Sequence, residues 1–419
     1  MDALTRRRFL RASGVVGAAA LATGGAVMGL AELLGTATND QPAWTRQKVS
    51  RLVLVTLYGG NDGLNTVIPY ADPAYHSARP ELAYPPEQVL HLDASLGLNP
   101  AMRRMKQAWD NKRLAIVLGV EYPSPNRSHF RSMDIWQSAT PTKPATTGWI
   151  GRWLDGTKAS REVAVSFEPV LPPVLAGQAR VGSCISYQGF SLPTWIDAAT
   201  VSALGRPQAG EPEMQARAAN SYADLVTMEH VIGGADKPAG SVSTDDGVSG
   251  PATGTGGDSE IAGQLELVAR CVEVGVPTRV YSVSLGGFDL HADERDAHQY
   301  LLGQLDSALG SFLDRMARTE AGRQVVVVVY SEFGRRVRAN ASDGTDHGTA
   351  APILVAGARV AGGFYGEQPS LTDLDDGDLK ASTDFRDVYG TVLATVLRAD
   401  PERYLDGFRP HLLPLFPPG

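Results

Sequence analysis

The sequence has little cysteine, and this excludes the commonest thiolate sites. Only two cysteines occur in 419 residues, Cys184 and Cys271, and they lack the Cys-x-x-Cys spacing of zinc or redox motifs. Cys271 shares a helical apolar stripe with Leu265 and Val268, which favours a buried thiol. A disulfide between the two cysteines is the alternative in an exported protein.

The chain also lacks the basic character of a nucleic-acid-binding protein. Its 38 lysines and arginines stand against 46 acids, and the formal net charge is −8. Residues 1–38 hold four arginines and two acids, so their removal lowers the net charge by two, to −10. Because nonspecific binding of nucleic acid needs a basic face, we expect no nucleic-acid partner.

The amino terminus has the form of an export signal. The segment Thr5-Arg6-Arg7-Arg8-Phe9-Leu10-Arg11 resembles a twin-arginine signal, and a run rich in alanine and glycine follows from Ala12 to Ala31. This run is long enough for a membrane helix, but its small residues make it marginal as a permanent anchor. We predict a signal peptide over 1–38 and export by the twin-arginine translocase to the periplasm or the cell exterior. No stable membrane span is expected once the leader is removed; an uncleaved anchor is the alternative.

The rest of the chain predicts an α/β protein. Buried strands alternate with amphipathic helices, and the five consecutive valines from Val325 are typical of a central parallel strand buried on both faces. Periodicity weakens between 140 and 260, and 233–259 is a low-complexity run of small and polar residues. We predict one domain over 44–419, with 140–260 as a variable insertion that forms a lid or cap and contains a flexible loop at 233–259.

Polar side chains follow several predicted strands at their carboxyl ends, where open α/β sheets bind ligands. Any one of these residues taken alone is better explained as a turn former, but their repetition favours a common site. Oxygen and imidazole donors without thiolates suit one or two divalent ions of zinc, manganese, magnesium, calcium or iron. The candidate metal ligands are Asp62, Asp289, His291, Glu332, Asp346 and His347.

A serine-containing loop precedes the helix that begins near Met133. Ser128, or alternatively Ser124, is either an N-cap or turn residue or a nucleophile at a helix N-terminus, where free N–H groups favour an anion. Arg127 is close enough in sequence to clamp an oxyanion. Arg335, which follows Glu332 in the chain, either has the same role or forms a structural ion pair.

These motifs in combination resemble the DUF1501 family of exported proteins, which is placed in the alkaline phosphatase and sulfatase superfamily. The motifs are Gly59-Gly60-Asn61-Asp62-Gly63, Arg127-Ser128-His129-Phe130, Gly286-Gly287-Phe288-Asp289-Leu290-His291, Ser331-Glu332-Phe333-Gly334-Arg335 and Gly344-Thr345-Asp346-His347-Gly348. The resemblance implies a three-layer α/β/α sandwich with a mostly parallel central sheet. It also implies two metal half-sites, one of Asp62, Ser128 and Glu332, the other of Asp289, His291 and His347.

Three departures from the superfamily pattern affect the expected site. Glu332 stands where aspartate is usual and Phe333 where a paired histidine is usual, so one half-site lacks a ligand unless His129 or Asp346 supplies it. Asp289 and His291 are closer in sequence than usual, which makes His298 a rival ligand. Serine replaces the cysteine from which sulfatases form formylglycine, so sulfatase chemistry by that route is disfavoured.

The expected function is that of an exported metal-dependent hydrolase acting on a phosphate, phosphonate or sulfate ester, either a small molecule or a polymer. Ser128 is expected to attack while the metal ligands hold one or two ions. The main alternative is a cell-envelope binding protein that keeps the fold without the chemistry. A phosphomutase or transferase is a third possibility.

Overall fold

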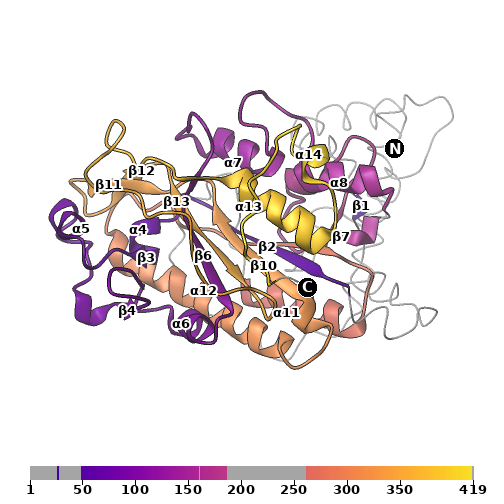
Figure 1. Ribbon diagram of the computed structural model, residues 1–419, viewed down its shortest axis with the longest axis horizontal. Helices are drawn as coiled ribbons and strands as arrows, with labels where there is room; N and C mark the ends of the chain where they lie inside the picture. Colours follow the sequence, from indigo (N-terminus) through magenta and orange to yellow (C-terminus); the bar gives the residue numbers. More distant parts are fainter. Residues whose placement is uncertain (1–25, 28–48, 160, 186–260, 418–419) are drawn as a thin grey trace, which may run out of the picture.

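A ten-stranded, mostly parallel sheet forms the centre of the protein in the computed structural model, which describes residues 26–27, 49–159, 161–185 and 261–417 (Figure 1). Neighbouring strands follow the order β1-β8-β7-β9-β2-β10-β13-β6-β14, and β15 also pairs with β6. The strands are β1 (Ala26–Val27), β8 (Ser183–Cys184), β7 (Ala164–Ser166), β9 (Val280–Leu285), β2 (Arg51–Leu57), β10 (Val325–Ser331), β13 (Ala351–Ala356), β6 (Leu114–Glu121), β14 (Gly363–Tyr365) and β15 (Thr383–Asp384).

One strand breaks the parallel pattern. β10 pairs in parallel with β2 along its whole length, from Val325 opposite Arg51 to Ser331 opposite Leu57. β13 is antiparallel to both of its neighbours, β10 and β6. Strands β2, β6, β7, β9 and β10 therefore point the same way, and their carboxyl ends lie along one edge of the sheet.

The valine run of β10 serves both faces of the sheet because successive side chains point in opposite directions. Val325, Val327 and Val329 pack into one hydrophobic cluster. Val326, Val328 and Tyr330 pack into the other. A strand buried on both faces needs an uninterrupted apolar sequence, and this is the sequence that predicted a central strand.

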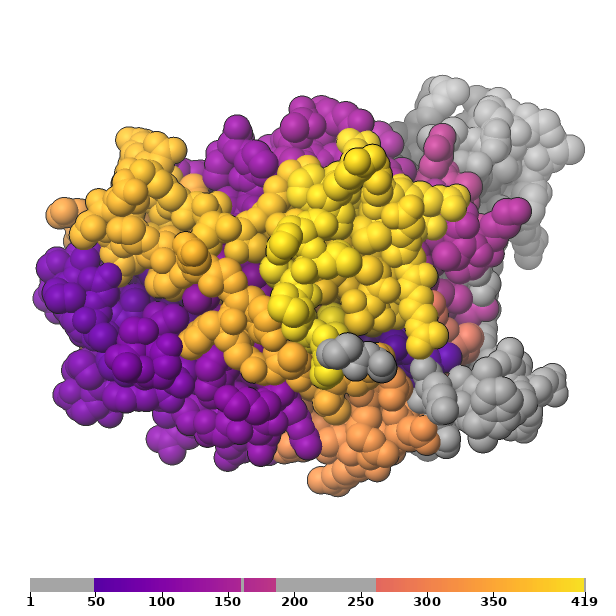
Figure 2. All heavy atoms as spheres, in the orientation of Figure 1, coloured from indigo at the N-terminus to yellow at the C-terminus, as the bar shows by residue number. Residues whose placement is uncertain are grey.

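Helices cover both faces of the sheet, so the predicted three-layer α/β/α fold is confirmed (Figure 1). The first face is covered by α6 (Arg103–Asp110), α11 (Ile261–Val274) and α12 (Glu294–Met316). The second is covered by α7 (His129–Ser138), α8 (Trp149–Thr157), α13 (Phe385–Val392), the π-helix η5 (Leu393–Leu397) and α14 (Pro401–Tyr404). In the space-filling view the yellow C-terminal segment lies over the middle of the face turned to the viewer (Figure 2).

Smaller elements surround the carboxyl edge of the sheet and form a third, smaller hydrophobic cluster with the segment 371–379. A three-stranded sheet orders β3, β5 and β4, and β11 pairs with β12. The bounds are α4 (Gly63–Thr66), β3 (Val67–Ile68), α5 (Pro73–Ala78), β4 (Leu90–His91), β5 (Gly97–Leu98), β11 (Arg335–Ala339) and β12 (Thr345–His347). Short 3₁₀ turns are η1 (Pro86–Gln88), η2 (Arg161–Val163), η3 (Pro173–Leu175) and η4 (Gly322–Gln324).

The region predicted as an insertion, 140–260, is described only to residue 185, and that part contributes β7 and β8 to the central sheet. The segment 186–260, with the loop 233–259, lies outside the described residues, as does the predicted leader apart from β1. Cys184 and Cys271 are both free thiols. Among the described helices, none has the length and hydropathy needed to cross a bilayer.

Candidate metal centre

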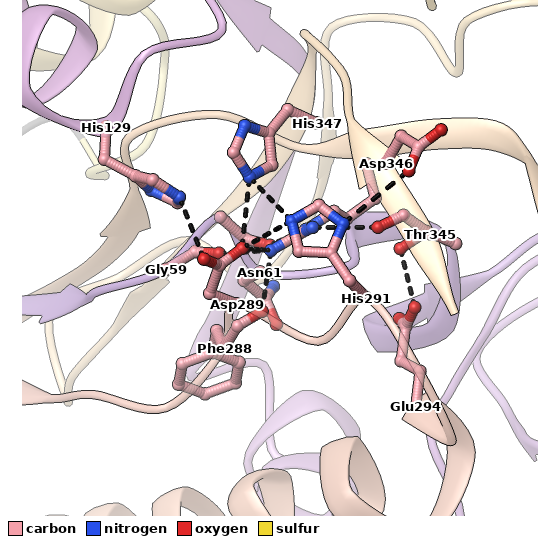
Figure 3. Close-up of polar contacts among 12 residues, drawn as sticks. Gly59, Asn61, His129, Phe288, Asp289, His291, Glu294, Thr345, Asp346 and His347 are labelled. Carbon is pink, nitrogen blue, oxygen red and sulfur yellow. Dashed lines mark hydrogen bonds and ion pairs between the residues drawn. The ribbon is translucent and has the colours of Figure 1, made fainter. Parts of the chain in front are cut away.

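Three side chains from the carboxyl edge of the sheet meet in one cluster (Figure 3). Asp289 follows β9, His129 is the first residue of α7, and His347 ends β12. One ligand atom from each lies within 4.8 Å of the others, and this is the only such group within the described ranges. The prediction placed these segments at one edge, and the structure brings Asp289 and His347 into contact there.

The Asp289 carboxylate is the centre on which the imidazole rings converge (Figure 3). Its Oδ1 lies 3.0 Å from Nε2 of His347 and 3.0 Å from Nε2 of His291, and it accepts a 2.8 Å hydrogen bond from Arg335. Its Oδ2 lies 3.3 Å from Nε2 of His129. Burial raises the pKa of Asp289, but the nearby side chains of His129, His347 and Arg335 outweigh burial and lower the pKa well below the usual range, so the group is a carboxylate.

The partners of the two outer imidazole nitrogens fix the tautomers. Nδ1 of His347 lies 2.8 Å from the carbonyl oxygen of Arg127, which can only accept, so Nδ1 carries the proton. Nδ1 of His129 lies 2.8 Å from Oε1 of Glu332 and donates to it. Both Nε2 atoms then face Asp289, where a protonated Nε2 donates to the carboxylate and a deprotonated Nε2 can offer its lone pair to a cation. Metal-ligating histidines in proteins are oriented in this way by an acceptor behind the ring.

His129 supplies a direct test of whether a cation fits. Its Nε2 is buried and has no aligned hydrogen-bond partner among the described residues, although it faces the Asp289 carboxylate. Burial lowers the pKa of His129, and the carboxylates of Asp289 and Glu332 outweigh burial and raise it to about 9. The position therefore attracts positive charge, either a proton or a divalent cation. Two imidazole nitrogens and a carboxylate oxygen are a suitable donor set for zinc-like ions.

His291 and Asp346 lie on the solvent side of the cluster. Nε2 of His291 is 3.1 Å from Nε2 of His347, and its Nδ1 is 3.6 Å from Oδ1 of Asp346. The two side chains are 45% and 61% exposed. His291 is therefore placed to complete the donor set or to meet a substrate, whereas Asp346 orients His291 and does not join the three converging side chains.

Glu332 contacts His129 on the side of the ring that faces away from Asp289. Its side chain is fully buried, and Oε1 accepts hydrogen bonds from the backbone N–H of Gly59 at 2.9 Å and from His129. Its Oε2 lies 3.0 Å from Oγ of Ser331. Glu332 was predicted as a metal ligand; in the structure its carboxylate contacts Nδ1 of His129 and is not one of the three converging side chains.

Arg335 is buried, and its guanidinium is occupied by protein oxygens. It donates to the carbonyls of Gly60 at 2.6 Å, Thr345 at 2.9 Å and Phe288 at 3.0 Å, and it pairs with Asp289. These bonds tie the turns after β2 and β9 to β12. The arrangement fits the structural alternative for Arg335 and leaves its donors occupied.

Asp62 lies outside the cluster, in a separate buried ion pair. Its Oδ2 is 2.6 Å from Arg79, and its Oδ1 caps α4 through the N–H of Leu64. Arg79 also donates to the carbonyls of Val337 and Arg336. Burial raises the pKa of Asp62, and the Arg79 charge is the main opposing influence that leaves it lowered. Nothing in the sequence marked Arg79, which follows α5.

Ser128 is exposed at the N-terminus of α7, and its hydroxyl makes no capping bond. It lies between two residues that build the cluster, since the Arg127 carbonyl holds His347 and His129 is itself a member. The Arg127 guanidinium pairs with Asp378. Ser124 is also exposed and has a left-handed backbone.

Phe333 fills the place where the superfamily pattern has a second histidine. Its ring centroid lies 4.9 Å from that of His129 and 4.8 Å from that of His347. Gly60 has φ +73°, and a Cβ there would lie 2.2 Å from the Phe333 ring. The turn after β2 therefore requires glycine in order to accommodate the phenylalanine.

His298, the rival ligand, lies apart from the cluster. It is buried on α12, and its Nε2 lies 2.8 Å from Oδ1 of Asn61. Burial is the main reason that its pKa is lowered to about 4, so it is neutral. Between the two replacements considered for the missing ligand, His129 and Asp346, the structure brings His129 into the converging group.

Glu294, at the start of α12, is a buried carboxyl group with a raised pKa. Burial and the nearby Asp62 carboxylate raise its pKa from 4.5 to about 8. The folded state therefore binds this proton more tightly than the unfolded chain. Its contribution to stability is full below the ordinary glutamate pKa and is lost as the pH rises through the folded value.

We expect the free energy of unfolding to fall between about pH 5.5 and about pH 8.5, and the Glu294→Gln variant to show a smaller fall. Urea denaturation of both proteins at the two pH values measures the difference. Equal changes in the two proteins would show that Glu294 does not carry this dependence.

Comparison with known proteins gives fold neighbours and a family. No curated protein matches the sequence. Similar solved structures include a protein of the alkaline phosphatase superfamily from Vibrio parahaemolyticus (8% identity, 88% of this chain, 74% of that chain, TM-score 0.39). The lipoteichoic acid synthase LtaP from Listeria monocytogenes (9%, 88%, 77%, 0.35) and Ps i-CgsB in complex with k-i-k-neocarrahexaose (11%, 86%, 75%, 0.39) are also similar. The family model described as "Protein of unknown function (DUF1501)" matches residues 49–409, and the chain belongs to this family.

Proposed function

We propose that the protein is an exported metal-dependent hydrolase of phosphate, phosphonate or sulfate esters, with Ser128 as its nucleophile. The observation that carries the proposal is the position of an exposed serine between Arg127 and His129, both of which contact the converging ligands. A serine that adjoins two residues of a cation-attracting cluster is a candidate to attack an anionic ester bound there.

His129, Asp289 and His347 would hold a divalent ion, and His291 is available as a further ligand. When bound, such an ion polarises phosphoryl or sulfuryl oxygens and stabilises charge that develops on them. A donor set rich in imidazole favours zinc or iron over magnesium or calcium. Glu332 and the Arg127 carbonyl contribute by holding the rings of His129 and His347 in their ligating tautomers.

The chain itself supplies the nucleophile and part of the anion site. The Ser128 oxygen would form a bond to phosphorus or sulfur as the bond to the leaving group breaks, and the serine proton passes to solvent. The first-turn N–H groups of α7 have no intrahelical acceptor and face the residue before the helix, where they favour negative charge. Water then hydrolyses the seryl ester and regenerates the enzyme.

Ser128→Ala is expected to lower kcat by at least about a hundredfold, because it removes the attacking oxygen. The control is Ser124→Ala, a change at the other exposed serine of the same loop, which is expected to keep turnover. Suitable probes are p-nitrophenyl phosphate, bis(p-nitrophenyl) phosphate, p-nitrophenyl phenylphosphonate and p-nitrophenyl sulfate. Turnover that survives in Ser128→Ala but fails in Ser124→Ala would reassign the nucleophile.

A non-catalytic binding protein of the cell envelope is the second candidate. It is favoured by Phe333, which takes the place of a ligand, and by Arg335, whose donors are occupied by protein oxygens. Metal content measured on protein exported by its own leader separates the two functions when it is combined with the probe assays. A hydrolase requires bound metal and turnover that a chelator removes, whereas bound metal without turnover of any probe supports the binding protein.

A further inference from the structure

We infer that the chain binds one divalent ion per molecule and that the place of a second is taken by its own buried cations, above all by Arg79. The inference rests on the metal site of the proposed function and specifies how many ions the protein binds. The superfamily pattern implies a second half-site of Asp62, Ser128 and Glu332. Each of the two carboxylates in that set is already committed to a partner within the protein.

Both oxygens of the Asp62 carboxylate are engaged by groups of the protein. Oδ2 pairs with Arg79 at 2.6 Å, and Oδ1 accepts the N–H of Leu64 at 3.2 Å. The side chains of Asp62 and Arg79 are 1% and 0% exposed. An ion at Asp62 would have to displace a guanidinium that is enclosed by protein.

Arg79 is fixed independently of its carboxylate partner. Its Nε donates to the carbonyl of Val337 at 3.0 Å, and a terminal nitrogen donates to the carbonyl of Arg336 at 2.7 Å. Both carbonyls belong to β11, which starts a few residues after β10. The positive charge is thus built into the fold at the carboxyl edge of the sheet, beside the carboxylate that the pattern assigns to a metal.

Glu332 is also committed. Its Oε1 accepts the N–H of Gly59 at 2.9 Å and lies 2.8 Å from Nδ1 of His129, and its Oε2 faces Ser331. If Glu332 turned toward an ion, His129 would lose the acceptor that orients it. Ligation of a second ion by Glu332 would therefore compete with the contact that orients His129.

The remaining position of the second half-site lacks a donor. Phe333 presents a carbon ring there, packed against His129 and His347. Arg335 adds a further fixed positive charge 2.8 Å from Asp289. Buried guanidinium groups therefore lie against both Asp62 and Asp289, and among the described residues only His129, Asp289 and His347 converge as a cation site requires.

The ion count tests this directly on the purified mature protein. Cobalt(II) titration followed by visible absorption, together with elemental mass spectrometry after dialysis against zinc, is expected to reach one equivalent for the wild type. Asp62→Asn is expected to retain one equivalent, and Asp289→Asn to bind none.

Two equivalents in the wild type, or loss of the ion in folded Asp62→Asn, would overturn the single-ion inference while leaving the proposed hydrolase standing. No ion in the wild type would overturn the inference together with the metal site of the proposed function. The wild-type titration decides the question even if Asp62→Asn fails to fold.

Discussion

Asp289→Asn is expected to abolish binding of the divalent ion and to lower turnover a few thousandfold. Asparagine keeps the shape of the side chain but removes the negative charge on which His129, His291 and His347 converge. One oxygen is also replaced by an N–H₂ group, which cannot ligate a cation and donates a hydrogen bond to the imidazole lone pair that an ion would need. Loss of a bound ion removes about 5 kcal/mol of stabilisation of developing charge, which corresponds to a few thousandfold in rate.

Elemental analysis and the probe assays measure the two effects separately. The matched control is Asp314→Asn on α12, where an exposed carboxylate pairs with Arg104, away from the three ligands. It is expected to keep both the ion and the activity. Asp289→Asn protein with a full equivalent of metal would remove Asp289 from the ligand set.

Arg79→Met is expected to destabilise the fold by about 3–5 kcal/mol, because it leaves the Asp62 carboxylate buried without its cation. Both side chains are almost inaccessible to water, so solvent cannot replace the lost partner. The carbonyls of Val337 and Arg336 lose donors in the same change. The midpoint of urea denaturation measures the loss.

The exposed pair of Arg104 and Asp314 provides the comparison, since its side chains are 39% and 68% exposed. Arg104→Met should cost no more than about 1 kcal/mol through loss of that pair. Adding Asp62→Asn to Arg79→Met should recover part of the larger loss by removing the unpaired charge. If Arg79→Met and Arg104→Met lower the free energy of unfolding equally, the buried pair does not stabilise the fold more than the exposed pair.

The sequence pattern was sufficient to predict an α/β fold with a central buried strand, and the family resemblance added the three layers. A strand buried on both faces must be apolar throughout, so the valine run of β10 could be recognised without a structure. The reversed direction of β13 left no such signal, because its apolar run is the same in either direction.

The candidate site was predicted only in part, for a physical reason. Position at a strand end follows from local sequence, and it correctly brought Asp289 and His347 to one edge. The partner of a buried carboxylate is decided by tertiary contacts. Asp62 is paired by an arginine that follows α5, and Glu332 by a histidine that begins α7. His129 could therefore be recognised as a ligand candidate beside Asp289 only from the tertiary structure, which shows where α7 begins.

The reversed strand β13 also determines how the site tolerates changes in chain length. An antiparallel strand can be entered from the edge where its neighbour ends, so no crossover helix is needed between β10 and β13. Only Gly348, Thr349 and Ala350 separate His347 from the first residue of β13. The strand that breaks the parallel pattern thus fixes the position of His347 through a short connection. Residues inserted between His347 and β13 would shift the His347 imidazole directly. Residues inserted after Ala356 would extend a loop at the opposite edge of the sheet.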